Sequence, residues 1–255
     1  MDARLLRLQA SFDAMEARLD TLESCVGGVV GAVGAGGAPG ASGASGASGA
    51  SGAPGPAPPS SAKGPTGAVV GAGESATVDR LQAELDAKGV SATFIRAPKE
   101  YYDETLEFRQ SVLGAPSVDC LCKSIVMENT RIDEASCRAD PSLRKYWLVI
   151  VQYACPGAKK ELLNKCVHGL QPSLSRKKVN MRVVAEDTSI ELSGFGKNAV
   201  SPIGLRTKMP IIMAKAIADL DAGVFWLGGG EVDVKAGLSV SSFIAAYEPI
   251  VAPLY

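Results

Sequence analysis

The spacing of apolar residues divides the chain into three parts, and the first is residues 1–25. Its apolar residues recur at alternating intervals of three and four, which is the spacing of a coiled-coil seam. They are Leu5, Leu8, Phe12, Met15, Leu19 and Leu22. The pattern predicts an isolated helix, which either pairs with a second copy as a parallel dimer or docks alone on a partner. About three heptads are marginal for stable self-association, so both alternatives stand.

Residues 26–75 lose this periodicity. They hold more than half of the chain's 28 glycines and only two charged residues, Lys63 and Glu74. Glycine recurs at every third position near residues 40–52, as in collagen, but the triplets are few and mostly lack proline. The composition predicts a disordered Gly/Ala/Ser/Pro-rich linker, because it cannot bury enough apolar surface to fold.

Residues 76–255 contain enough patterned sequence for one folded domain. Period-two and continuous apolar runs predict strands at residues 91–96, 119–127, 145–154, 181–184, 211–213, 224–227 and 232–234. Helical spacing and capping residues predict helices at 77–88, 103–113, 158–167, 186–192 and 240–247. The two kinds of element intermix without a regular βαβ rhythm, which predicts an α+β domain with a mixed sheet and flanking helices.

Composition and charge exclude several classes of protein. The net charge is −1 and the pI about 6.0, so any nucleic-acid contact must come from a local patch. One basic run, at residues 176–178, either contacts phosphates or is simply solvated. No apolar run reaches the roughly 18 residues of a membrane span, and the charged N-terminus does not resemble a secretion signal, so we expect a cytoplasmic protein with no membrane contact.

The cysteines and the single histidine, His168, do not match the patterns of metal sites or of histidine-activated nucleophiles. Six cysteines show no zinc-ligand spacing, and one histidine leaves no Ser-His-Asp arrangement. The late glycines at 228–230 do not form a dinucleotide-binding motif. We therefore expect no metal site, no cofactor and free thiols.

One loop, residues 194–204, interrupts the apolar pattern. It reads Gly-Phe-Gly-Lys-Asn-Ala-Val-Ser-Pro-Ile-Gly, which excludes a regular helix or a central strand. It is either a connector or a site, because an ordered loop of this kind can present backbone N–H groups to carboxyl, phosphate or carbonyl oxygens.

Two charged residues in predicted strands are further candidates. Lys123 either faces a cleft with Leu121, where it would supply a positive charge, or lies on the solvated face. Asp233 follows the late glycines, and its alternation partners Glu231 and Lys235 are both charged, which favours a solvent-facing position.

The order of these features resembles the YbaK/prolyl-tRNA-synthetase-associated domain family, over residues 77–250. The loop resembles the family's Gly-Tyr followed by Ile/Val-Ser-Pro-Leu-Gly, here Gly194-Phe195 and 200–204. Lys123 resembles the family's strand lysine, and Asp233 its acidic residue after a late Gly-Gly pair. The family consists of aminoacyl-tRNA deacylases, which hydrolyse mischarged tRNA in trans. The residues at 198–204 and 225–233 are similar to those of a eukaryotic branch of this family.

The resemblance implies a YbaK-like fold and a site without a protein nucleophile. Lys123 would hold the acyl carbonyl or the terminal ribose-phosphate, the backbone of Asn198 and Ser201 would stabilise the oxyanion, and Asp233 would orient the amino group or a water. Residues implied to bind substrate are Gly194, Phe195, Ala199, Val200, Pro202, Ile203, Gly204, Gly228 and Gly229. The implied partners are the 3′-terminal adenosine and acyl group of aminoacyl-tRNA. Residues 1–25 would bind a synthetase, a multi-synthetase complex or a second copy.

Three departures separate this chain from the family pattern. Asn198-Ala199 replaces Gly-Gly, Leu227 replaces a serine found in some members, and the segment 128–147 is longer than expected. The first change puts the pose of the oxyanion-binding amides in question. The alternative function is therefore a non-catalytic accessory subunit that binds tRNA or a synthetase.

Overall fold

The computed structural model describes residues 64–155 and 157–255. The helix predicted at 1–25 and most of the predicted linker lie outside the described residues. The folded part nevertheless begins before residue 76, because strand β1 (Ala68–Val69) pairs antiparallel with β2 (Ala92–Arg96). The Gly67 N–H also donates to the carbonyl of Val112, at 2.9 Å. The last residues assigned to the linker thus form the edge of a sheet.

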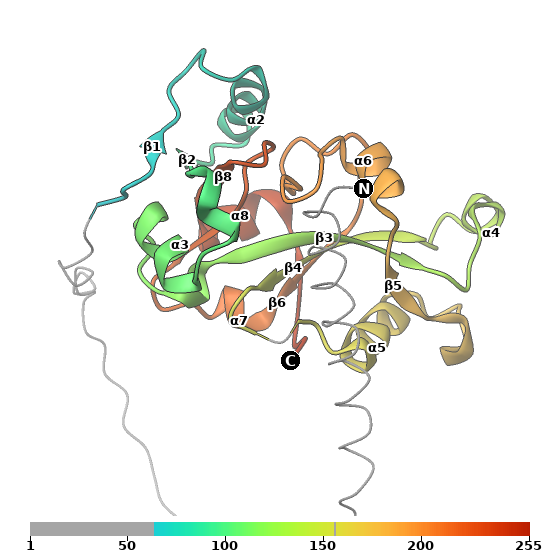
Figure 1. Ribbon diagram of the computed structural model, residues 1–255. Coiled ribbons are helices and arrows are strands. Elements are labelled where there is room, and N and C mark those ends of the chain that lie inside the picture. Colours follow the sequence, from blue (N-terminus) through green and yellow to red (C-terminus); the bar gives the residue numbers. More distant parts are fainter. Residues whose placement is uncertain (1–63, 156) are drawn as a thin grey trace, which may run out of the picture. The chain divides into compact units, whose positions relative to one another are not determined.

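Nine strands form two sheets in the described part of the chain, which confirms the α+β class with a mixed sheet (Figure 1). One sheet has the order β1-β2-β8-β7 and is antiparallel throughout. The other has the order β5-β3-β4-β6-β9, in which β4, β6 and β9 run parallel. The remaining strands are β3 (Cys122–Asn129), β4 (Tyr146–Gln152), β5 (Met181–Val183), β6 (Ile211–Ala214), β7 (Val224–Gly228), β8 (Val234–Ser239) and β9 (Ile250–Ala252).

The helices begin at side-chain caps where the sequence supplies them. Ser75 accepts from the N–H of Val78, Thr105 from that of Phe108 and Ser239 from that of Ser242. The helices are α2 (Ala76–Ala87), α3 (Leu106–Leu113), α4 (Glu134–Ala139), α5 (Lys160–Leu170), α6 (Glu186–Ser193), α7 (Lys215–Ala218) and α8 (Val240–Tyr247). Short 3-10 helices are η1 (Lys99–Tyr102), η2 (Val118–Cys120) and η3 (Arg176–Lys178).

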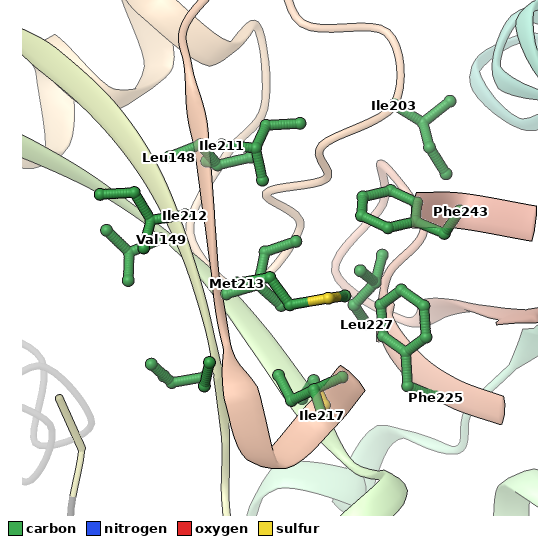
Figure 2. Packing of buried hydrophobic residues seen from close by; sticks show 14 of the residues in the cluster. Leu148, Val149, Ile203, Ile211, Ile212, Met213, Ile217, Phe225, Leu227 and Phe243 are labelled. Atoms are coloured by element: carbon green, nitrogen blue, oxygen red, sulfur yellow. The ribbon is translucent and has the colours of Figure 1, made fainter. Parts of the chain in front are cut away.

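The core lies between the two sheets. Met213 of β6 extends its side chain toward Leu227 and Phe225 of β7, and Phe243 of α8 lies beside them (Figure 2). The rings of Phe225 and Phe243 meet edge to face, with centroids 5.3 Å apart, and both are fully buried. All residues of β4 after Tyr146 are buried, as its continuous apolar run predicts for a strand covered on both faces.

Three predicted elements differ from the structure. The helix predicted at 103–113 begins only at Leu106, because η1 and Thr105 precede it. The strand predicted at 119–127 is η2 followed by β3. The strand predicted at 232–234 is a turn followed by β8, which begins at Val234. The long segment 128–147 contains α4, and Figure 1 shows it at the opposite end of β3 from α3.

Within the described ranges, no helix is both long and apolar enough to cross a bilayer. Five cysteines are free thiols, and two of them, Cys120 and Cys122, are buried.

Replacing Phe243 with alanine should lower the free energy of unfolding by about 3–5 kcal/mol, because the change removes a fully buried ring and leaves a cavity. Val251→Ala is the control, since Val251 is 41% exposed, and it should cost less than about 1 kcal/mol. Denaturant unfolding of both variants measures the difference. Equal losses would show that the contact between the sheets does not depend on this ring.

Candidate functional site

The loop 194–204 is attached at both ends. It starts at Gly194, which caps α6 in the left-handed conformation at φ 81°. It ends at Gly204, whose carbonyl accepts from Arg80 Nη1 and whose N–H donates to Glu84 Oε2, both at 2.9 Å. Arg80 also lies over the ring of Phe195, at 5.5 Å. Two side chains of α2 therefore hold the ends of the loop.

The middle of the loop lies directly on the backbone that follows β7. The carbonyl of Ala199 accepts from the N–H of Gly230, at 3.2 Å. A Cβ placed on Gly228 would come within 2.5 Å of the carbonyl oxygen of Val200. The glycine at 228 is thus required by the close approach of two backbones.

Asn198 adopts a left-handed conformation, with φ 64°, which asparagine tolerates better than most residues. Its carbonyl oxygen accepts two hydrogen bonds, from Tyr102 Oη at 3.0 Å and from Lys235 Nζ at 3.3 Å. The loop is thereby joined to η1 and to β8.

Several N–H groups of the loop remain available. Ala199 donates to the carbonyl of Gly196 at 3.1 Å, and Ile203 donates to the Ser201 hydroxyl at 3.2 Å. The N–H groups of Asn198, Val200 and Ser201 donate to no atom in the part of the chain that the structure describes. Backbone N–H groups of an ordered loop that have no acceptor within the described residues are suited to bind an oxygen ligand.

Ser201 differs from the other two, because it is fully buried. Its hydroxyl stabilises the turn that precedes Gly204, so its side chain does not face solvent. Gly194 is partly exposed, and seven further loop and glycine candidates are buried: Phe195, Ala199, Pro202, Ile203, Gly204, Gly228 and Gly229. Val200 is partly exposed and Asn198 is exposed, so their amides lie closest to solvent.

Beside Asn198 lies a group that we call the tyrosine–cation cluster: Tyr101, Tyr102, Tyr153, Arg109, Lys123 and Lys235. The Arg109 guanidinium carbon is 5.5–5.6 Å from the centroids of all three tyrosine rings. Its Nε and Nη2 donate to the carbonyls of Tyr101 and Tyr102, at 2.9 and 2.8 Å. Arg109 thus fixes the tyrosine pair of η1.

The two lysines of the cluster approach different rings. Lys123 Nζ lies 5.4 Å from the centroid of Tyr153, and Lys235 Nζ lies 4.8 Å from that of Tyr102. Lys123 therefore faces this cluster, in agreement with the first of the two orientations considered for it. The cluster connects Lys123 to the loop, because Tyr102 also bonds the Asn198 carbonyl.

The cluster carries positive charge without a neutralising carboxylate. Within the described residues, none of Arg109, Lys123 and Lys235 forms an ion pair. Burial lowers the pKa of Lys123. Burial, opposed in part by Asp233 and aided by Arg109, lowers the pKa of Lys235 to about 7. A site of this kind favours an anionic ligand, which would offset the cost of burying the cations.

Asp233 lies at the turn before β8 and is engaged elsewhere. Its Oδ2 accepts from Arg96 Nη1 at 2.6 Å, and Arg96 also pairs with Glu231 at 3.3 Å. Glu231 in turn accepts a hydrogen bond from the Ser75 hydroxyl that caps α2. The Asp233 side chain is 44% exposed. It influences Lys235 electrostatically but makes no hydrogen bond to the cluster.

Lys235 is the main residue that the sequence analysis missed. Alternation from Glu231 through Asp233 placed it on a solvent face, whereas its exposure is only 5%. The alternation fails because residues 231–233 form a turn, so the strand phase begins only at Val234. The signal that the sequence did offer for a buried Lys235 is its pair of apolar neighbours, Val234 and Ala236. In the structure these residues belong to a strand that lies between β2 and β7. Tyr101, Tyr102, Arg109 and Tyr153 were also missed, because they come from three segments, η1, α3 and the residues after β4, that only the fold brings together.

The chain matches no family model and no curated protein, but it matches solved structures. A candidate trans-editing enzyme for prolyl-tRNA synthetase gives a TM-score of 0.52 at 18% identity, over 71% of this chain and 97% of that one. A structure from work on computational epitope backbone grafting gives 0.51 at 17%, over 71% and 97%. A hypothetical protein gives 0.51 at 14%, over 69% and 98%. The chain therefore shares the fold of these proteins over nearly their whole length.

Gly228→Ala should displace the loop, because its Cβ would meet the backbone of Val200 and Ala199 rather than a flexible side chain. We expect a loss of about 1–3 kcal/mol in the free energy of unfolding, together with shifted amide resonances at 198–201. Gly169→Ala is the control, since nothing lies within 4 Å of a Cβ there. An unchanged loop spectrum in Gly228→Ala would contradict the backbone contact.

The free energy of unfolding should rise with pH between 6.5 and 8.5 by about 2 kcal/mol through Lys235 alone. The unfolded chain keeps the Lys235 proton up to a pKa near 10.4, whereas the folded chain releases it near 7, so raising the pH favours the folded state. Lys235→Met should lose this share of the pH dependence. Urea unfolding of both proteins across this range measures it, and parallel pH profiles would show that Lys235 does not titrate there.

Proposed function

We propose that this chain is a trans-acting aminoacyl-tRNA deacylase, which hydrolyses the ester of mischarged tRNA. The observation that carries the proposal is the tyrosine–cation cluster beside a loop whose N–H groups at 198, 200 and 201 have no acceptor among the described residues. The 3′ end of an aminoacyl-tRNA presents a flat base, phosphates and an ester carbonyl in close succession. Aromatic faces, cations and backbone donors are the groups that bind these three features.

The roles follow from the position of each group. A tyrosine ring of the cluster would stack on the terminal adenine, and Lys123 with Arg109 would hold the phosphate or the ester oxygens. The N–H groups of Asn198 and Val200 would stabilise the oxyanion that forms on the carbonyl. Ser201 would act through its backbone and through the turn that its hydroxyl stabilises, rather than as a nucleophile.

The reaction needs water as its second substrate. Water adds to the ester carbonyl carbon, the bond from that carbon to the ribose oxygen breaks, and the ribose oxygen takes a proton. The products are the free amino acid and the tRNA. Asp233 would bind the substrate's ammonium group through Oδ1, which accepts no hydrogen bond within the described residues. Catalysis would rest on positioning and on preorganised donors.

The fold of the candidate trans-editing enzyme supports this proposal at the level of architecture. We further propose that the protein works in the cytoplasm and that residues 1–25, joined by the linker, bind a synthetase, a multi-synthetase complex or a second copy. A tether of this kind raises the effective concentration of the domain near newly charged tRNA.

A non-catalytic tRNA- or synthetase-binding subunit is the second candidate. One observation favours it: Arg96 pairs with Asp233, the carboxylate that acts electrostatically on Lys235. The site then has cations and aromatic rings for binding but a weakened group for orienting water.

Lys123→Ala should lower kcat/KM for deacylation of the best substrate by about 10- to 100-fold, because it removes a partly buried cation from the substrate-facing cluster. The assay follows release of the amino acid from a panel of mischarged tRNAs with the purified full chain. Lys215→Ala is the control, since Lys215 is exposed and pairs with Asp219, which directly follows α7, and it should retain full activity.

Two results of this assay would contradict parts of the proposal. Equal activity of Lys123→Ala and wild type would remove Lys123 from the site but leave the deacylase function standing. No hydrolysis across the whole panel, with tRNA binding that still depends on Lys123, would establish the accessory-subunit function instead.

A further inference from the structure

Lys235 occupies an unusual position for a lysine. It lies on β8, between β2 and β7, with a side chain that is 5% exposed. Its Nζ donates to Tyr102 Oη at 2.6 Å, to the carbonyl of Val232 at 2.8 Å and to that of Asn198 at 3.3 Å. These three acceptors belong to η1, to the turn before β8 and to the loop. One buried ammonium thus joins three segments that are distant in sequence.

We propose that Lys235 is a positioning residue: its ammonium holds the Asn198 carbonyl and so sets the direction of the loop amides that follow. The proposal deepens the deacylase function, on which its catalytic consequence rests. The contact itself is independent of that function.

Peptide planarity explains how a carbonyl contact controls the amides. In a trans peptide the C=O and the next N–H point in opposite directions. Because Lys235 and Tyr102 hold the Asn198 carbonyl, the Ala199 N–H points away from them, toward Gly196. Because Gly230 holds the Ala199 carbonyl, the Val200 N–H points away from Gly230. The two peptide planes that precede the Val200–Ser201 peptide are therefore both held, one of them by Lys235.

The charge state of Lys235 should alter this contact. The groups that face its ammonium are Tyr101 and Tyr102 from η1, Arg109 from α3 and Asp233 from the turn. Burial and Arg109 favour the neutral amine, whereas Asp233 favours the charged form, and the resulting pKa is about 7. A neutral amine has two N–H groups and one lone pair. If both N–H groups stay on Tyr102 and Val232, the longest contact, to Asn198, is lost; if the lone pair accepts from the Tyr102 hydroxyl, that hydroxyl no longer donates to Asn198. In both cases the Asn198 carbonyl loses one of its two hydrogen bonds on deprotonation.

The test is a pH titration of the loop amides by ¹H–¹⁵N NMR in the full chain. The Val200 and Ser201 signals of the wild type should titrate with a midpoint near pH 7, and in Lys235→Met they should not titrate. Lys123→Met is the matched control, because Lys123 is also partly buried in the cluster but makes no hydrogen bond to the loop within the described residues. It should keep the loop titration.

A second variant covers the case in which Lys235→Met does not fold. Tyr102→Phe removes the acceptor of the shortest Lys235 contact, so the charged amine loses support and the loop midpoint should move to lower pH. Loop signals that do not titrate in the wild type, or that keep the same midpoint in Lys235→Met or Tyr102→Phe, would overturn the proposal.

The two proposals fail separately. If the loop titrates as expected but no tRNA is deacylated, Lys235 positions the loop of a binding protein and only the enzymatic function falls. If deacylation occurs, its pH profile should show the same midpoint near 7 and lose it in Lys235→Met. An active Lys235→Met enzyme with the wild-type profile would remove Lys235 from the mechanism.

Discussion

The close contact between the loop 194–204 and the backbone after β7 determines the geometry of the site. Only a residue without a Cβ fits at Gly228, because the carbonyl oxygen of Val200 occupies the space of that atom. The Gly230 N–H donates a hydrogen bond to the Ala199 carbonyl, so the backbone of the loop packs directly on the backbone at the end of the sheet. This contact leaves the Asn198 carbonyl where Tyr102 and Lys235 can reach it. A side chain at position 228 would therefore push the loop away from the tyrosine–cation cluster.

The cations of the tyrosine–cation cluster lower the stability of the fold, because their burial has an unfavourable electrostatic free energy that packing elsewhere must offset. Lys235 is almost fully buried and Lys123 is partly buried, and neither has a carboxylate partner among the described residues. Burying a charge without a partner costs free energy. Selection for stability alone would therefore remove such residues. Unpaired cations gathered on aromatic rings are therefore typical of a site that a ligand completes. The extensive apolar core between the two sheets supplies the stability that this arrangement needs.

Much of the fold could be predicted from the sequence because local patterns carry it. The apolar run of β4, the caps at Ser75 and Ser239 and the stop at Gly114 each depend on a few neighbouring residues. The loop could be recognised from its glycines and proline, but alternation left two orientations open for Lys123, and only the structure shows that it faces Tyr153. The cluster could not be recognised, because its members lie on five segments that only the tertiary structure brings together. Lys235 was misplaced for a local reason: the turn at 231–233 shifts the strand phase that alternation assumes.

Asn198 shows how a departure from a family pattern can be compatible with a site. The left-handed conformation at φ 64° costs a non-glycine residue about 1 kcal/mol, and asparagine less than most. Two hydrogen bonds to its carbonyl, each worth about 1 kcal/mol, are enough to offset that cost. Glycine at this position would adopt the same conformation freely but would also leave it freely. With asparagine, fewer conformations compete with the one that Lys235 and Tyr102 hold. The substitution is therefore compatible with an ordered loop of the kind that the proposed function requires. The conformation of this loop then depends in part on the hydrogen bonds from Lys235 and Tyr102 to the Asn198 carbonyl.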